Sequence, residues 1–234
     1  MSIVSLDVFK EISKNPQTAF LGIQEFNPTD LLSWKEIEDY FNNPYLYTKD
    51  NVFIIDQYGS IKDLKQKTYA WSSAIHCSAK EIFDDINEGK SFYCANFNKF
   101  SNKCNNLSSE IYQNINIPNM NLDFHVYGGL KNFSQSFSIH RDYANNIIFQ
   151  IDGESHWKVY NANSSIAERN LYSDDNLQLL IDYILKPGDL LYIPMGNYHK
   201  CNPLSKRLSI SACFFENEKE DCFIDTNWYS FNLN

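Results

Sequence analysis

The 234-residue sequence predicts an α+β protein that is mainly β, with an antiparallel barrel or double-sheet jelly roll as its main part. Short β-branched and aromatic runs gather after residue 122, and Gly, Pro, Asn and Asp turns separate them. Helix start and stop signals lie before them. Because no repeat, linker or break in composition divides the chain, we expect a single domain over 1–234. It comprises a mixed helical N-terminal region (1–121), the barrel core (122–216) and a tail (217–234).

Three helices and one hairpin are expected in the N-terminal region. Ser33 and Ser78 each precede a helical run and stand three residues before a Glu, which is the capping-box pattern. Gly89 is expected to end the second helix. The third helix should cover 103–114. The run 51–63 is β-rich and contains a Gly-Ser turn, so it predicts a hairpin.

Five strands are expected in the barrel, and their residue types are those that favour strands. They are the runs LDFHVYGG, NIIFQIDG, SHWKVY, LLYIP and RLSISACFF. Along the last run the small and polar residues alternate with the apolar ones, so the two sets should face opposite sides of a sheet.

The charge balance excludes several classes of partner. With 20 basic and 29 acidic side chains the formal net charge is −9, which disfavours a nucleic-acid partner. The uncharged stretch 69–79 is shorter than the ~20 residues of a membrane-spanning helix. Charged residues within the first dozen positions do not resemble a signal peptide. We therefore expect a cytoplasmic protein that engages no membrane, with its six scattered cysteines reduced.

Two histidines and one aspartate form the strongest chemical signal. His140 and Asp142 are two residues apart, so an extended strand would point both side chains to one face. His199 follows a turn that contains Pro194 and Gly196. Two histidines and one carboxylate on one face of a metal are the ligand set of non-haem Fe(II) oxygenases. Alone, an H-x-D pair is common by chance, and a lone buried histidine is more often structural. The spacing of the later Gly, Pro, Gly and His strengthens the metal interpretation.

Two stretches carry a resemblance to a known family. FHVYGGLKNFSQSFSIHRDYANNIIFQIDGESHWKVY and KPGDLLYIPMGNYH resemble the JmjC-type, cupin-fold Fe(II)/2-oxoglutarate oxygenases, especially the bacterial and ribosomal-oxygenase-like protein hydroxylases. The resemblance covers 122–215. It implies that His140, Asp142 and His199 are the catalytic metal ligands, and that 2-oxoglutarate and O₂ are cosubstrates. Small cupins fit less well because they have a histidine in place of Asp142, and the carboxylate also disfavours a halogenase.

The residues that would contact 2-oxoglutarate are less clear from the resemblance. Asn146 matches an asparagine that lies beside the cosubstrate in several family members, although it could equally satisfy local backbone groups. The family usually places Lys or Arg fifteen residues after the first histidine, and here that position is Ser155. A hydroxyl cannot replace the missing charge.

Arg207 is the better candidate for the cosubstrate carboxylate. In other 2-oxoglutarate oxygenases an R-x-S pair on the last barrel strand binds that group, and Arg207 with Ser209 resembles it. The alternative is a strand-start arginine that faces solvent. Tyr127 is a further possible partner of the carboxylate. His76, in a helical or loop segment, and His125, on an early strand, are more simply structural.

The resemblance implies hydroxylation of an amino-acid side chain in a protein or peptide, and a histone demethylase is less favoured because no basic patch is present. Hydroxylation of a free amino acid or another small biosynthetic molecule is the close alternative. A metal-binding barrel without 2-oxoglutarate turnover stays open because of Ser155. An iron enzyme that does not use 2-oxoglutarate also stays open, and a homodimer is possible.

Overall fold

The computed structural model describes residues 2–69, 72–117, 120–162 and 177–216. The helices are α1 (Leu6–Lys14), α2 (Trp34–Asn42), α3 (Ala79–Glu88) and α4 (Asn102–Asn114), with two 3-10 turns, η1 (Pro28–Asp30) and η2 (Phe97–Lys99). The early strands are β1 (Phe20–Gly22), β2 (Val52–Ile55), β3 (Ile61–Lys62), β4 (Gln66–Tyr69), β5 (Ser72–Cys77) and β6 (Ser91–Cys94). The barrel strands are β7 (Met120–Gly129), β8 (His140–Arg141), β9 (Asn145–Asp152), β10 (Ser155–Tyr160), β11 (Leu179–Leu185), β12 (Leu190–Ile193), β13 (Tyr198–Pro203) and β14 (Arg207–Glu216).

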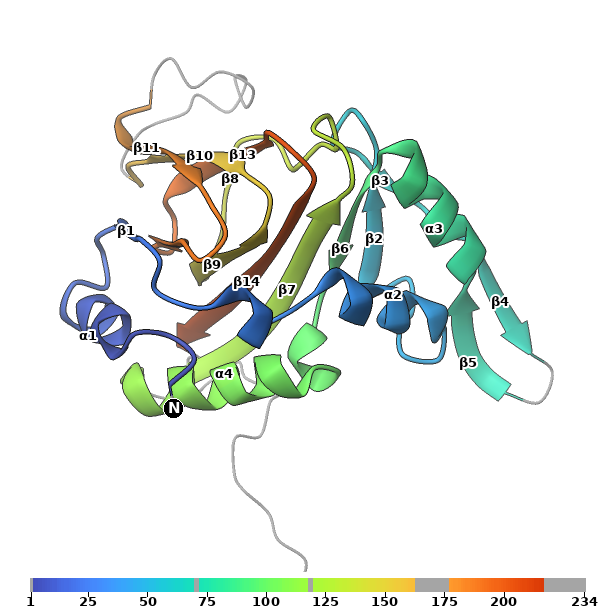
Figure 1. The fold of residues 1–234 in the computed structure, drawn as a ribbon, viewed down its shortest axis with the longest axis horizontal. Helices are drawn as coiled ribbons and strands as arrows, with labels where there is room; N and C mark the ends of the chain where they lie inside the picture. The colour runs from blue at the N-terminus through green and yellow to red at the C-terminus, as the bar shows by residue number, and fades with distance from the viewer. Residues whose placement is uncertain (1, 70–71, 118–119, 163–176, 217–234) are drawn as a thin grey trace, which may run out of the picture.

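Two antiparallel sheets form the body of the protein (Figure 1). The major sheet has eight strands in the order β1-β12-β9-β14-β7-β6-β2-β3, and the minor sheet has four in the order β11-β10-β13-β8. β4 and β5 form a separate hairpin. This arrangement confirms the mainly β, jelly-roll prediction, and the five barrel strands expected from the sequence all lie in these sheets.

The three predicted helices form, and two of them begin at the caps that the sequence indicates. The Ser33 hydroxyl accepts a hydrogen bond from the backbone of Glu36, and the Ser78 hydroxyl accepts one from the backbone of Glu81. Gly89 ends α3 with a φ of +106°, a conformation that glycine adopts without the steric cost of a side chain. The predicted hairpin is also present, since β2 pairs with β3.

The two faces of the major sheet differ in chemistry. On β7 and β14 the even-numbered residues pack with the helices in the larger apolar core, as Phe124 and Ile210 do. The odd-numbered residues, including His125, Arg207 and Ser211, face the space beside the minor sheet, where the cavities lie. A smaller apolar cluster, which includes Trp157 and Ile148, links the two sheets. Because of this alternation, apolar side chains pack with the helices and polar side chains face the cavities.

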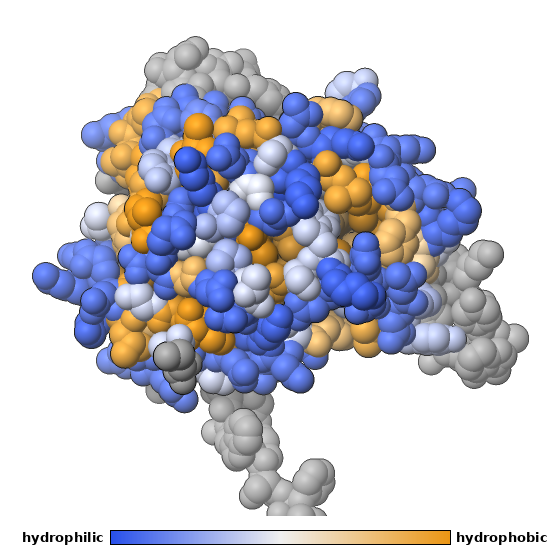
Figure 2. All heavy atoms as spheres, in the orientation of Figure 1, coloured by the Kyte–Doolittle hydropathy of each residue, from blue (hydrophilic) through white to orange (hydrophobic). Residues whose placement is uncertain are grey.

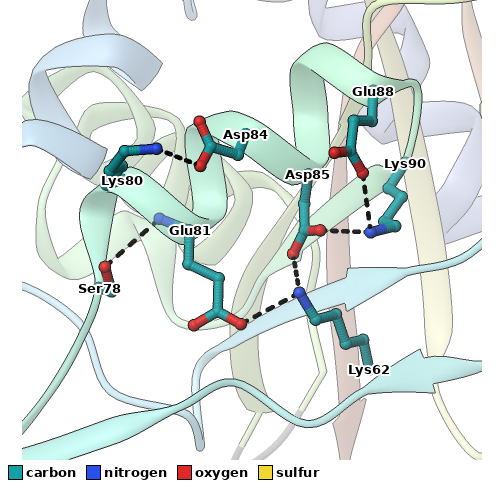
Figure 3. A network of polar contacts seen from close by, with 8 residues as sticks. All are labelled: Lys62, Ser78, Lys80, Glu81, Asp84, Asp85, Glu88 and Lys90. Atoms are coloured by element: carbon teal, nitrogen blue, oxygen red, sulfur yellow. Dashed lines mark hydrogen bonds and ion pairs between the residues drawn. The ribbon is translucent and has the colours of Figure 1, made fainter.

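An ion-pair network joins α3 to the sheet (Figure 3). The buried carboxylate of Asp85 contacts the ammonium groups of Lys62 on β3, at 2.5 Å, and of Lys90 just after α3. Glu81 binds Lys62 as well, at 3.1 Å. Because Lys62 is on an edge strand of only two residues, these contacts hold the edge of the major sheet to the helix.

Several other elements and residues differ from the predictions made from the sequence. The helix α1 and the strands β1, β4, β5, β6, β8 and β11 were not expected. His76 lies on β5, so its expected place in a helical or loop segment was wrong. The predicted tail, 217–234, lies outside the described residues. Within the described ranges, no helix is long and apolar enough to cross a membrane. Five of the cysteines are described, and all five are free thiols, as expected.

The surface is mostly hydrophilic on the face that Figure 2 shows, with apolar residues gathered over the minor sheet at the upper left. On β11, the edge strand of that sheet, Leu179, Leu180 and Ile184 are exposed.

Candidate metal centre and adjoining cavities

The structure brings the three predicted metal ligands together. β8 pairs with β13 so that His140 lies directly opposite His199, and Asp142 follows two residues after His140. One ligand atom from each residue lies within 4.8 Å of the other two. The Asp142 carboxylate is 3.8 Å from Nε2 of His140 and 3.6 Å from Nε2 of His199. Both sheet pairing and local sequence spacing therefore produce the cluster.

Both imidazole rings are held in the orientation that a metal requires. Nδ1 of His140 contacts the carbonyl oxygen of Ser138 at 2.7 Å, and Nδ1 of His199 contacts that of Asn197 at 3.0 Å. A carbonyl only accepts hydrogen bonds, so Nδ1 carries the proton in each ring and Nε2 presents its lone pair to the cluster. Burial and the neighbouring His140 lower the pKa of His199 to about 4, so this ring is neutral at pH 7.

Asn146 supports the carboxylate of the cluster. Its Nδ2 donates to Oδ2 of Asp142 at 2.9 Å and to the carbonyl of Ala144 at 3.3 Å. The side chain is almost fully buried on β9. The contact with the Ala144 carbonyl fits the interpretation that Asn146 satisfies local backbone groups, and its place beside the cosubstrate stays a prediction.

A small inner cavity of about 30 Å³ lies beside the cluster, with Arg207 in its wall. Arg207 is 2% exposed, so the alternative of a solvent-facing arginine was wrong. Nη1 donates to Sγ of Cys201 at 2.9 Å, whereas Nε and Nη2 have no hydrogen-bond partner among the described residues. The indole Nε1 of Trp157 in the same wall is equally unpartnered. Buried donors of this kind indicate a missing acceptor.

Tyr127 and Ser155 are the other two residues predicted to contact the cosubstrate, and they differ in whether they line a cavity. Tyr127 lines both the inner cavity and its larger neighbour, and burial raises the pKa of its hydroxyl well above the usual value, so it stays protonated. Ser155 is fully buried and is absent from the lining of the inner cavity. Burial raises the pKa of the neighbouring Cys201 thiol, and Arg207 is the main group that opposes this rise.

A larger outer cavity of about 920 Å³ begins at His140 and Asp142 and extends along the inner face of the major sheet. Its walls are mainly aromatic, with Phe53, Tyr93, Tyr127 and Phe137 in successive ring contacts. Tyr143, at 83% exposure, stands at its rim. The ring of Phe137 also contacts that of His140, so the aromatic series reaches the candidate metal centre.

His125 is the main residue whose surroundings the sequence did not indicate. The sequence favoured a structural histidine, yet the ring lines the outer cavity and contacts Asp123 and Cys213. The three residues lie on adjacent strands, so only the pairing of β7 with β14 brings them together.

The model of the JmjC domain matches residues 100–222, which is more than half of the chain. The chain belongs to the JmjC domain family. This membership confirms the resemblance noted in the sequence. Among curated JmjC relatives, ribosomal oxygenase 2 of Mus musculus is 34% identical over 100 residues, which cover 40% of this chain and 21% of the relative. The bifunctional lysine-specific demethylase and histidyl-hydroxylase NO66 of Aedes aegypti is 26% identical over 98 residues, covering 39% and 15%.

Solved structures show the same fold. One structure of the Escherichia coli ribosomal oxygenase YcfD aligns with a TM-score of 0.64 at 16% identity, covering 97% of this JmjC chain and 59% of that chain. Another, of YcfD in complex with cobalt and 2-oxoglutarate, aligns with a TM-score of 0.59 at 18% identity, covering 86% and 49%. The chain thus spans about a fifth of the length of the curated relatives and about half of the solved structures.

Proposed function

We propose that the protein is an Fe(II)- and 2-oxoglutarate-dependent dioxygenase that hydroxylates an amino-acid side chain of a protein or peptide. The observation that carries this proposal is the buried Arg207, whose Nε and Nη2 are unpartnered next to a cluster of two histidines and one carboxylate. The cluster suits iron and the guanidinium suits a carboxylate, so the two features together favour an iron enzyme with an acidic cosubstrate.

The donor set fits Fe(II). In this proposal Nε2 of His140, Nε2 of His199 and the Asp142 carboxylate hold the metal, and the remaining positions stay open for other ligands. The lone pairs of both rings already point to the cluster because backbone carbonyls bind the opposite nitrogens. When bound, iron, 2-oxoglutarate and O₂ supply the oxidising chemistry. The side chains of the protein orient these groups and the substrate and exclude water.

The inner cavity fits one carboxylate of 2-oxoglutarate. Its volume of about 30 Å³ admits a small polar group rather than a whole dicarboxylate. It shares His140, Asp142 and Tyr127 with the outer cavity, so the rest of the molecule would extend toward the metal. Arg207 would replace the positive charge that the family usually places at the position of Ser155. Nε and Nη2 can each donate one hydrogen bond to the same carboxylate.

The outer cavity favours a peptide over a free amino acid. Its volume of about 920 Å³ is near the upper end of the roughly 300–1,000 Å³ typical of small-molecule sites. A free amino acid would leave much of this aromatic space to water, whereas a polypeptide segment could cover it. The relatives named as ribosomal oxygenases and as a histidyl-hydroxylase point the same way. Cytoplasmic location and a homodimer remain predictions from the sequence.

The test uses metal-free protein without oxygen. Fe(II) and then 2-oxoglutarate are added, and the visible charge-transfer band of the chelated complex is recorded. We expect a band with the unchanged protein and with Lys206→Gln, which removes a more exposed cation next to the proposed anchor. Arg207→Gln should need at least tenfold more 2-oxoglutarate. Iron binding without any band would instead favour the barrel that does not turn over 2-oxoglutarate.

A further inference from the structure

A chain of hydrogen bonds connects the candidate ligand Asp142 to a histidine on another strand. It runs from Asp142 through Asn146 and Cys213 to His125 and ends at Asp123. Its distances are 2.9 Å from Nδ2 of Asn146 to Oδ2 of Asp142, 2.7 Å from Sγ of Cys213 to Oδ1 of Asn146, 3.3 Å from Sγ to Nδ1 of His125, and 3.0 Å from Nε2 of His125 to Oδ2 of Asp123. Strands β9, β14 and β7 supply its members except Asp142, which lies between β8 and β9.

The sheet register explains why these residues meet. Cys213 is paired with Asn146 on one side and with Asp123 on the other. His125 is two residues from Asp123 and therefore shares its face of the sheet. These hydrogen bonds thus join neighbours across the sheet, and Asp142, Asn146, Cys213 and His125 line the cavities.

Each hydrogen bond in the chain has only one possible direction. The carboxylate of Asp142 and the carbonyl of Ala144 are acceptors, so the NH₂ end of Asn146 must face them and its oxygen must face Cys213. The thiol of Cys213 then donates to that oxygen, as the hydroxyl of Ser211 also does.

The histidine must therefore carry two protons. Because the thiol proton lies toward Asn146, the sulfur can only accept from Nδ1 of His125, while Nε2 donates to the carboxylate of Asp123. Burial lowers the pKa of His125, but the hydrogen bonds with Asp123 and Cys213 outweigh burial and raise the pKa to about 10. The series of hydrogen bonds thus ends at the imidazolium of His125, which is bonded to the carboxylate of Asp123.

We propose that His125 is a positioning residue, which with Asp123 holds the Cys213 thiol toward Asn146 and thereby fixes the amide that orients Asp142. This inference rests on the proposed function, because it assigns these hydrogen bonds a role in holding a metal ligand. If Cys213 could turn its proton elsewhere, the oxygen of Asn146 would keep only the donor from Ser211, and the amide would be held less firmly. The carboxylate of Asp142 would then be less well ordered for metal binding.

The test measures Co(II) binding to the metal-free full chain, through the dissociation constant and the visible absorption bands of the bound ion. Asn146→Ala, which removes the direct contact, should weaken binding by roughly 10- to 100-fold, the range found for partners of metal ligands. His125→Asn should weaken it by about tenfold and alter the band shape. The matched control is His156→Asn, because His156 forms a similar pair with Asp182 away from the cavities. This control should bind Co(II) like the unchanged protein.

Two variants of Cys213 keep the test decisive if His125→Asn folds poorly. Cys213→Ser retains a group that both donates and accepts, so its Co(II) affinity should stay within about twofold of that of the unchanged protein. Cys213→Ala breaks the chain and should resemble His125→Asn. Equal affinities of the Ser and Ala variants would overturn the inference, as would an unchanged affinity in a folded His125→Asn variant. If the unchanged protein itself binds neither Co(II) nor 2-oxoglutarate, the proposed function fails instead.

Discussion

Nη1 of Arg207 donates a hydrogen bond to Sγ of Cys201 at 2.9 Å, so a guanidinium on the major sheet reaches a thiol on the minor sheet. This contact fixes one of the three nitrogens, and Nε and Nη2 of this cavity-lining residue have no partner among the described residues. A planar group held at one nitrogen is well suited to bind a carboxylate through its other two nitrogens.

The first prediction concerns the shape of that guanidinium. Arg207→Lys keeps the positive charge but loses the two-point geometry, because an ammonium group is a single point charge. We expect the dissociation constant for 2-oxoglutarate, titrated by the charge-transfer band, to rise about tenfold in Arg207→Lys and further in Arg207→Gln. Equal constants in the two variants would show that geometry contributes nothing, and iron affinity should change little in either.

The second prediction concerns His199. His199→Ala removes one of the three ligands and leaves an incomplete set for iron. Iron binding, measured by metal analysis after desalting, and 2-oxoglutarate consumption, measured by release of CO₂, should be lost together. Persistent consumption in this variant would rule out the assigned ligand set. The control is again His156→Asn, which should retain both.

The third prediction concerns stability and its dependence on pH. Burial raises the pKa of Asp85, but Lys62 and Lys90 outweigh burial, so the pKa lies below the usual 3.8. The charged carboxylate therefore stabilises the folded state above pH 3.8, and this contribution is lost as the pH falls through the lowered pKa.

Asp85→Asn should lower the free energy of unfolding by about 2 kcal/mol at pH 7, because two lysines lose their charged partner. The difference from the unchanged protein, measured by urea unfolding, should shrink below pH 3.8. Asp84→Asn is the matched control, since Asp84 forms an exposed pair with Lys80 on the same helix (Figure 3) and should cost less than 0.5 kcal/mol, roughly the value of such pairs. A difference that persists undiminished in acid would contradict the ion-pair explanation.

The fourth prediction concerns the turn between β9 and β10. Gly153 has a φ of +70°, and a Cβ placed on it would lie 1.6 Å from the carbonyl oxygen of Lys206, which is part of the backbone. Gly153→Ala should therefore cost well over the roughly 1–2 kcal/mol that a left-handed backbone costs other residues. Gly59, with a φ of +80°, has its nearest atom at 3.4 Å, so Gly59→Ala should show the backbone cost alone. Comparing the two melting temperatures separates steric overlap from backbone strain, and equal losses would contradict the assignment.

Features fixed by local sequence could be predicted before the structure was known. Ser33, Ser78 and Gly89 act through hydrogen bonds and backbone angles within a few residues, so their helices appear where expected. Strand alternation likewise placed Arg207 and Cys213 on one face of β14. The spacing of His140 and Asp142 required only an extended backbone.

The remaining features depend on contacts between distant segments. β8 has only two residues and exists because β13 pairs with it, so no local pattern marks it. The surroundings of His125 depend on the register of β7 and β14, which a single sequence does not encode locally. The burial of Arg207 follows from the packing of two sheets, whereas its neighbour Lys206 in the preceding turn is exposed.

The position of Arg207 on the major sheet has a consequence for how related sequences are compared. A column-by-column alignment finds a serine at position 155 and would class the chain as lacking a cosubstrate anchor. The structure has a buried guanidinium in the wall of the inner cavity, on a strand more than fifty residues later in the chain. In the proposed function, the major sheet therefore supplies the binding charge, whereas Ser155 lies on the minor sheet. Surveys of this family should therefore compare charges by their location in the barrel rather than by alignment column.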